Sequence, residues 1–215
     1  MTMRRVFVDP ESPQRDAIRE AAHWILNGAI VAVPTDTLYG LAVDPFGSDA
    51  VRRLFAAKGR AAGHAIPLIA ADVSQVMKQL APLPPQTARL AERFWPGPLT
   101  VLVATPVSLA RDVDGGTGTV GVRVPNDGVA RAIAEACGRP ITATSANISG
   151  EPATANPDDV ERMLGDRIDL LIDTGLLPGG LPSTIIDARS GEARLVRAGA
   201  VGWDEIERCL RGERV

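Results

Sequence analysis

Apolar residues recur along the chain with two different spacings, which alternate from one segment to the next. Residues 18–27 carry apolar side chains three and four positions apart, the spacing of a helix, and Gly28 is expected to end that helix. The next segment, 29–33, is apolar throughout and is followed by Pro34, as expected for a buried strand. Repeated alternation of these two patterns favours an α/β architecture.

The same two patterns extend through the rest of the chain. Helical spacing predicts further helices at 48–58, 73–80, 85–94, 128–137, 157–164 and 203–210. Short apolar runs predict further strands at 66–70, 99–104, 119–124, 141–144, 170–173, 183–187 and 194–197. We expect Ser48 to cap its helix, and the Gly- and Pro-rich residues 176–182 to form a surface loop. Because the strands are unevenly spaced, a mixed, twisted sheet is expected rather than a regular doubly wound one.

Composition narrows the class of protein. The 215 residues are 45% hydrophobic and 23% charged, the balance of an ordinary globular chain with one main core. No apolar run reaches the roughly 20 residues that span a bilayer, and no apolar segment follows Arg4 and Arg5, so neither a membrane span nor a signal peptide is expected. Two distant cysteines, Cys137 and Cys209, disfavour a disulfide framework and a zinc site, which fits a cytoplasmic location.

The net charge of −3 disfavours tight, non-specific RNA binding as the main task, because that affinity comes from neutralising phosphates. A local basic cleft remains compatible with this charge. Aromatic residues make up only 4%, which leaves little material for stacking on bases.

Two polar segments follow directly on predicted strands, where open α/β sheets generally bind ligands. Residues 34–40 combine two hydroxyls, a carboxylate and a phenol, and residues 142–150 combine hydroxyls with the amide of Asn147. Either segment suits a small polar ligand. The alternative is that these side chains only satisfy turns at the strand ends.

Two further segments carry charge or glycine. Lys58 and Arg60 flank Gly59 at a helix end, where two cations suit a polyphosphate. The alternative is a helix end with Gly59 as its left-handed cap. The glycine-rich residues 115–119 precede Arg123, but neither a Walker A loop nor a Rossmann fingerprint occurs in the chain.

Taken in order, these segments resemble the YrdC-like family from about residue 17 to residue 201. The matching runs are VPTDTLYGL at 33–41, KGR at 58–60, WPGPLT at 95–100, GVRVP at 121–125, TSAN at 144–147 and PSTI at 182–185, with Arg197 in the last predicted strand. The resemblance implies one domain over 1–215, with an open, twisted, mixed sheet flanked by helices around a deep concave cavity. It also implies synthesis of threonylcarbamoyl-AMP from L-threonine, bicarbonate and ATP with release of pyrophosphate. That product is the first intermediate in modifying the tRNA adenosine next to the anticodon.

The resemblance further implies a role for each site residue. Lys58 and Arg60 are expected to hold the triphosphate and to act in catalysis, with Arg197 opposite them. Nucleotide contacts are implied for Thr119 and Asn147, the threonine carboxylate is assigned to Arg123, and hydrogen bonds to the amino acid are assigned to Thr35, Ser145 and Ser183. Mg²⁺ is expected to arrive with ATP rather than at a protein metal site. Neutralising phosphate charge is what adenylyl transfer chiefly requires. No residue of the matching runs stands out as a general base; Asp36 is conceivable in that role but is not favoured.

Partners and alternatives follow from the same resemblance. The expected partner is the threonylcarbamoyl transferase complex that acts on tRNA, with weak or indirect contact to tRNA itself. Ala61 stands where many relatives have proline, so the stretch after Arg60 is expected to be looser. The alternatives are a diverged paralogue acting as an RNA-binding or ribosome-assembly factor, and a carbamoyl-transfer module.

Overall fold

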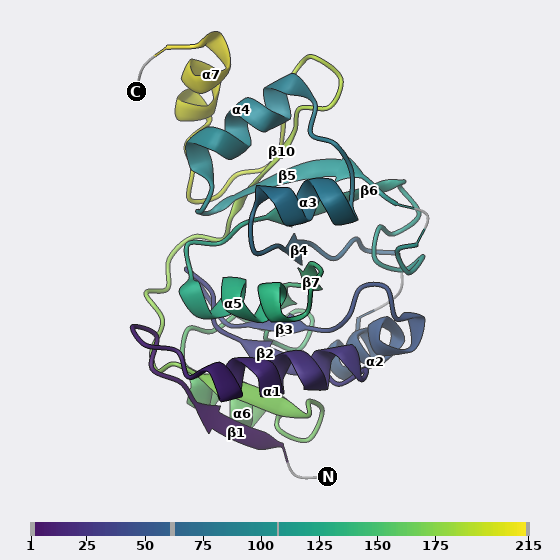
Figure 1. The fold of residues 1–215 in the computed structure, drawn as a ribbon, viewed down its shortest axis with the longest axis vertical. Helices are drawn as coiled ribbons and strands as arrows, with labels where there is room; N and C mark the ends of the chain where they lie inside the picture. Colours follow the sequence, from purple (N-terminus) through teal and green to yellow (C-terminus); the bar gives the residue numbers. More distant parts are fainter. Residues whose placement is uncertain (1–2, 61–62, 107, 214–215) are drawn as a thin grey trace.

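A computed structural model of the chain describes residues 3–60, 63–106 and 108–213 (Figure 1). The described residues form seven helices and eleven strands, and both sheets mix parallel and antiparallel pairs. The predicted mixed α/β class is therefore confirmed. The strands divide between two sheets, which lie one below the other along the long axis of the molecule in Figure 1.

The first sheet contains the strand that precedes the polar residues 34–40. β9 pairs in parallel with β1 on one side and with β2 on the other, whereas β3 is antiparallel to both β2 and β8. All three residues of β2 are fully buried, because helices cover both faces of this sheet. In spatial order the strands are β1 (Arg4–Phe7), β9 (Leu170–Asp173), β2 (Val31–Val33), β3 (Gly40–Ala42) and β8 (Thr144–Ser145).

The second sheet has one face in a hydrophobic core and one face toward the first sheet's loops. Val101 and Val122 belong to the core, whereas their neighbours Thr100 and Arg123 point to the opposite face, as the two-residue repeat of a strand requires. In spatial order the strands are β11 (Arg194–Arg197), β10 (Thr184–Asp187), β5 (Leu99–Ala104), β6 (Thr119–Arg123), β4 (Leu68–Ile69) and β7 (Ile141–Thr142).

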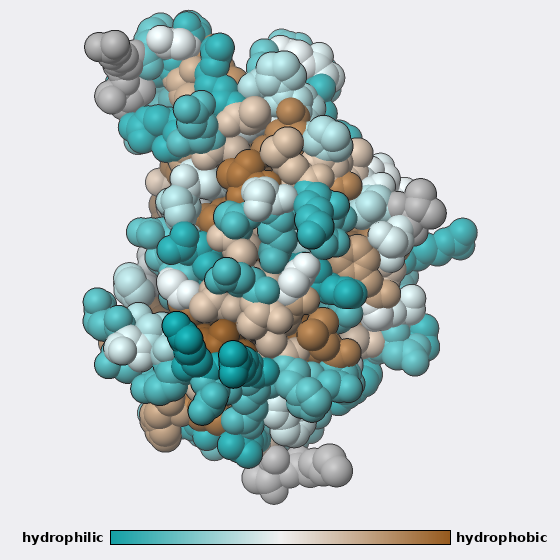
Figure 2. Space-filling model, viewed as in Figure 1, coloured by the Kyte–Doolittle hydropathy of each residue, from teal (hydrophilic) through white to brown (hydrophobic). Residues whose placement is uncertain are grey.

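The helices form layers on the sheets. α1 and α5 pack against each other and share a core with Val31 and Val33, while α4 packs against α7 beside the second sheet. Hydrophilic side chains cover the outward side of α1 in Figure 2, opposite its buried residues Ile18, Ala22 and Ile25. The helices are α1 (Arg15–Leu26), α2 (Ser48–Lys58), α3 (Val73–Gln79), α4 (Pro85–Phe94), α5 (Gly128–Ala136), α6 (Pro157–Leu164) and α7 (Trp203–Arg211). None of these described helices has the length and apolar character needed to cross a membrane.

Three local predictions needed correction. The strand predicted at 141–144 is two short strands, because the chain leaves the second sheet after Thr142 and joins the first at Thr144. Ser48 is the first residue of α2 rather than its cap, and the capping position is Gly47, without a side-chain hydrogen bond. β1 and β3 were not predicted. The loop 176–182 is at the surface as predicted, with Leu176 and Leu181 exposed.

Candidate active site

A pocket of about 610 Å³ is lined by residues from both sheets, and three of them are arginines. We call it the arginine pocket. None of its described lining residues is acidic, although the whole chain carries a net charge of −3. Six of the nine predicted site residues line this pocket: Thr35, Arg60, Arg123, Ser145, Ser183 and Arg197. The pocket therefore suits an anionic ligand that also carries hydrogen-bonding groups.

Arg123 ends β6 and enters the pocket as part of a buried ion pair. Its Nη1 lies 2.6 Å from Oδ1 of Asp36, and the two side chains are only 9% and 10% exposed. The other oxygen of Asp36, Oδ2, accepts a hydrogen bond of 3.1 Å from the backbone N–H of Asn126. This pair joins the loop that follows β2 in the first sheet to the end of β6 in the second.

Arg197 lies at the mouth of the pocket and contacts a second predicted site residue. Its Nη2 donates to the backbone oxygen of Ser183 at 2.7 Å and lies 3.2 Å from the Ser183 hydroxyl. The side chain is exposed, yet enough protein surrounds it that desolvation, followed by the charge of Arg123, lowers its pKa. Gly199 permits this arrangement, because a Cβ there would lie 2.2 Å from the backbone oxygen of Pro182.

Lys58 lies beneath the pocket and is 3% exposed. Its ammonium group donates to the backbone oxygens of Ser145 and Asn147, the latter at 2.8 Å, and to Asn147 Oδ1 at 3.1 Å. An ammonium has three N–H donors, so these three acceptors occupy all of them. Burial, and then the neighbouring charge of Arg60, lowers the pKa of Lys58 to about 8.

Asn147 holds the same loop through both ends of its side-chain amide. Its Oδ1 accepts from Lys58 and from the Ser145 hydroxyl at 2.5 Å, and its Nδ2 donates to the backbone oxygen of Glu151 at 2.5 Å. Asn147 and Lys58 thus fix the backbone that places Ser145 in the arginine pocket. Gly59 has φ 60° and ends α2 as a left-handed cap, so the structural alternative for this segment also holds.

Comparison with known proteins identifies the family. The Sua5/YciO/YrdC family model, described as "Telomere recombination", matches residues 23–199. The chain belongs to this family. The threonylcarbamoyl-AMP synthase of Pyrococcus abyssi is 38% identical over 193 residues, covering 90% of this chain and 57% of that protein. The threonylcarbamoyl-AMP synthase of Halorhodospira halophila is 41% identical over 176 residues, covering 81% of this chain and 91% of that protein.

Solved structures of the Sua5/YciO/YrdC family share this fold. The crystal structure of Pyrococcus abyssi Sua5 complexed with L-threonine superposes with a TM-score of 0.90 at 36% identity, covering 95% of this chain and 60% of that one. The chain thus spans less than two thirds of the length of either Pyrococcus abyssi protein.

Three predicted site residues of this Sua5/YciO/YrdC member do not line the arginine pocket. Lys58 and Asn147 lie behind its wall, as described above. Thr119 shares a face of β6 with Arg123 but lies at the other end of the strand, where its hydroxyl is 3.0 Å from that of Thr117. The nucleotide contacts of these residues stay predictions. Of the looser stretch predicted at 61–65, residues 61 and 62 lie outside the described residues, and the prediction is not tested.

The sequence analysis gave no individual role to two residues that line the pocket, although Tyr39 belongs to the polar segment 34–40. Thr100 is 1% exposed, lines the pocket, and its hydroxyl lies 2.8 Å from that of Ser183. The buried Tyr39 lines the pocket, and its hydroxyl donates to the backbone oxygen of Gly175 at 2.8 Å. Both residues belong to runs that matched the family, 33–41 and 95–100, and this match is the signal that could have identified them.

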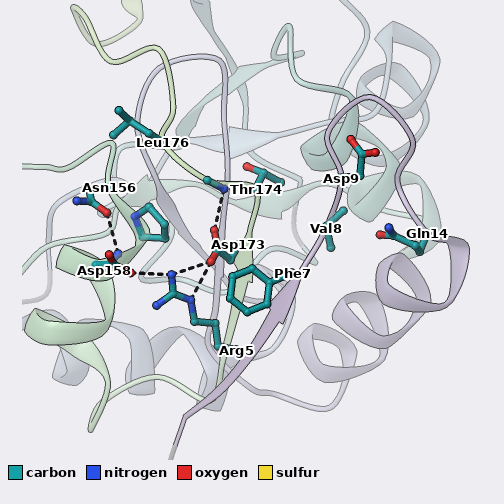
Figure 3. A pocket seen from close by; sticks show the side chains of 12 residues that line it. Arg5, Phe7, Val8, Asp9, Gln14, Asn156, Asp158, Asp173, Thr174 and Leu176 are labelled. Carbon is teal, nitrogen blue, oxygen red and sulfur yellow. Dashed lines mark hydrogen bonds and ion pairs between the residues drawn. The ribbon is translucent and has the colours of Figure 1, made fainter.

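A second pocket of about 520 Å³ surrounds Arg5, at the ends of β1 and β9 and the start of α6. We call it the Arg5 pocket. Figure 3 shows the guanidinium of Arg5 directed at Asp173 and Asp158, and both lie 2.7 Å from it. Glu161 adds a third carboxylate at 2.6 Å. This arginine is thus engaged by protein carboxylates, and none of the predicted site residues lies here.

Proposed function

We propose that this chain synthesises threonylcarbamoyl-AMP from L-threonine, bicarbonate and ATP. One observation carries the proposal: three guanidinium groups and several hydroxyls face one pocket whose described lining includes no carboxylate. An amino acid carboxylate and a triphosphate both require such cations. The names of the synthases in Pyrococcus abyssi and Halorhodospira halophila supply the product, and the L-threonine bound to Pyrococcus abyssi Sua5 supports threonine as a substrate.

The proposed roles follow from where each side chain lies. Arg123 would bind the threonine carboxylate, and the hydroxyls of Thr35, Ser145 and Ser183 would bind the rest of the amino acid. Arg60 and Arg197 would bind the triphosphate. Among the described residues no carboxylate lies within 4.0 Å of either of these two arginines, so their charge is available to a ligand.

The proposed reaction has two steps. The threonine amine and bicarbonate first give N-carboxy-threonine and water. The new carboxylate then attacks the α-phosphorus of ATP, the bond to the β-phosphate oxygen breaks, and pyrophosphate leaves. Mg²⁺ enters as part of the substrate MgATP. The protein would contribute mainly by positioning the reactants and by neutralising charge on the phosphate oxygens.

The alternatives are less favoured. Three guanidinium groups in one pocket suit a triphosphate as well as RNA, but the relatives above are named as synthases and not as RNA-binding proteins. We further propose a cytoplasmic location and transfer of the product to the complex that modifies tRNA, since an acyl-adenylate is useful only beside the enzyme that consumes it.

The proposal is tested by measuring pyrophosphate release from purified protein with MgATP, bicarbonate and L-threonine. We expect release that depends on both threonine and bicarbonate, with threonylcarbamoyl-AMP detected by mass spectrometry. L-Serine, which lacks only the threonine methyl group, and a reaction without amino acid are the controls. A folded protein that binds ATP but releases no pyrophosphate with threonine would contradict the proposal and favour a diverged paralogue.

A further inference from the structure

Asp36 stands apart from the other carboxylates near the site. It is the only acidic residue among the described residues with an ion pair to an arginine of the pocket lining, yet it is not itself a lining residue. Both of its oxygens are occupied, Oδ1 by Arg123 and Oδ2 by the backbone N–H of Asn126. A carboxylate placed in this way is poorly suited to take a proton from a substrate in the pocket.

We infer that Asp36 is a positioning residue that fixes the guanidinium of Arg123 for recognition of the substrate carboxylate. The inference rests on the proposed function. It adds a residue that does not itself touch threonine but on which threonine binding depends. Asp36 would act only through Arg123.

The hydrogen bonds of Arg123 support this role. A guanidinium has five N–H donors, and the described chain gives the side chain of Arg123 one partner, the bond from Nη1 to Asp36. The remaining donors are left for the pocket that Arg123 lines. A guanidinium held at one nitrogen by a buried carboxylate presents its other edge in a fixed direction, as a bidentate contact to a ligand carboxylate requires.

Charge supports the same role. Arg123 lies close enough to Arg197 for its charge to lower the pKa of Arg197, so the two guanidinium groups repel each other. Asp36 offsets this repulsion for Arg123. Without Asp36, Arg123 would lose its only anchor among the described residues and would turn away from the like charge.

The chain offers a matched control. Asp44 also follows a strand of the first sheet, binds an arginine through one oxygen (Arg139, 3.3 Å) and accepts from a backbone N–H two positions later through the other (Phe46, 2.9 Å). Asp44 and Arg139 do not line the arginine pocket. Asp44→Ala therefore removes an aspartate–arginine pair away from the site, one that is more exposed, since the side chain of Arg139 is 41% exposed.

The test compares steady-state pyrophosphate release by the full chain and its variants. We expect Asp36→Ala to lower kcat/KM for threonine about 100-fold, since a misplaced contact costs roughly that much, and to leave the KM for ATP within about twofold. Asp36→Asn keeps one acceptor oxygen and is expected to recover activity to within about tenfold of the wild type. Asp44→Ala is expected to change neither KM.

A double-mutant cycle decides whether Asp36 acts through Arg123. In an Arg123→Met background, Asp36→Ala is expected to change kcat/KM for threonine by less than about twofold. A further large loss would instead make Asp36 a general base and overturn the inference. If Arg123→Met does not fold, the comparison of Asp36→Asn with Asp44→Asn decides, because a merely structural role would not raise the KM for threonine alone.

Failure of the inference is distinguishable from failure of the proposed function. A wild-type protein with threonine-dependent release whose Asp36→Ala variant behaves like Asp44→Ala overturns the inference and leaves the function standing. A folded wild-type protein without threonine-dependent release overturns the proposed function, and the inference with it.

Discussion

Arg5 and Arg197 each lie on an edge strand and each help to line a pocket, but their surroundings are opposite. Arg5 contacts three carboxylates at 2.6 to 2.7 Å, and one of them, Asp173, is 2% exposed. Among the described residues, the side chain of Arg197 hydrogen-bonds only to the backbone oxygen and the hydroxyl of Ser183. Protein carboxylates balance the charge of Arg5 in its pocket, whereas two of the three guanidinium groups of the arginine pocket have no carboxylate partner in the described part of the chain.

This difference separates stability from binding. A buried carboxylate beside an arginine depends on that arginine, so the pair around Arg5 belongs to the fold. A guanidinium with no protein carboxylate keeps its charge available until an anion arrives, so Arg60 and Arg197 belong to the site. Asp36 and Arg123 combine both conditions, because one edge of Arg123 is paired with protein and the other faces the pocket.

The largest effect is expected from Arg5→Ala. Removing this arginine leaves the buried carboxylate of Asp173 without its counter-charge, which is expected to lower the free energy of unfolding by about 3 kcal/mol. Activity per folded molecule is expected to stay unchanged, because Arg5 does not line the arginine pocket. Chemical denaturation and pyrophosphate release measured on the same sample check both parts.

Arg4→Ala is the control for that variant. Arg4 is the neighbouring residue on β1, and its ion pair with Glu20 is exposed to solvent. An exposed pair contributes less than about 1 kcal/mol, so little destabilisation is expected. Equal losses of unfolding free energy in Arg5→Ala and Arg4→Ala would contradict a stabilising role of the Arg5 pocket.

Lys58→Ala is expected to lower the free energy of unfolding by less than Arg5→Ala does, but to lower activity directly. The substitution removes the ammonium donor that three oxygens of Ser145 and Asn147 share, so the loop that places Ser145 shifts. We expect kcat to fall about 100-fold, together with a lower melting temperature. Lys78, the only other lysine in the sequence, is exposed on α3, and Lys78→Ala is the control. Near-normal turnover of Lys58→Ala would remove Lys58 from the site altogether.

Much of the architecture could be predicted because local patterns determine it. β5, β9 and β11 have the predicted bounds, as do α4 and α6, since apolar spacing and flanking Pro or Gly mark these ends. Six of the nine predicted site residues line one pocket because the ordered motifs of the resemblance come from segments that meet there.

The parts that could not be predicted depend on contacts between distant segments. The chain passes from one sheet to the other after Thr142, whose hydroxyl hydrogen-bonds to the backbone of both Leu41 and Val43. No local sequence pattern encodes these bonds. The role of Lys58 as a buried clamp depends on acceptors 87 and 89 residues away. Asp36 and Arg123 are 87 residues apart, so local sequence patterns could not predict their ion pair either.

Arg197→Ala tests the contrast between the two pockets through the KM for ATP. Loss of one cation at the pocket mouth is expected to raise the KM for ATP about tenfold, because charge-assisted hydrogen bonds to phosphate contribute roughly 1.5 kcal/mol or more. The melting temperature is expected to hold, since the side chain is exposed. Arg194→Ala, on the same strand but outside the pocket, is the control. A destabilised Arg197→Ala variant with an unchanged KM for ATP would mean that Arg197, like Arg5, stabilises the fold and does not bind ATP.

The smallest effect concerns the protonation of Lys58, which unlike Arg5 is a cation buried without a carboxylate partner among the described residues. Burial, and then the charge of Arg60, lowers its pKa to about 8, below the ordinary value of 10.5. Between these values the unfolded chain holds a proton that the folded chain has released, so the free energy of unfolding rises with pH. From pH 8 to pH 9 this contribution is about 1 kcal/mol. Denaturation of the wild type and of Lys58→Met at both pH values isolates it: the stability of the wild type relative to the variant should increase with pH, and a constant difference would mean that the contacts to Ser145 and Asn147 hold the ammonium charged.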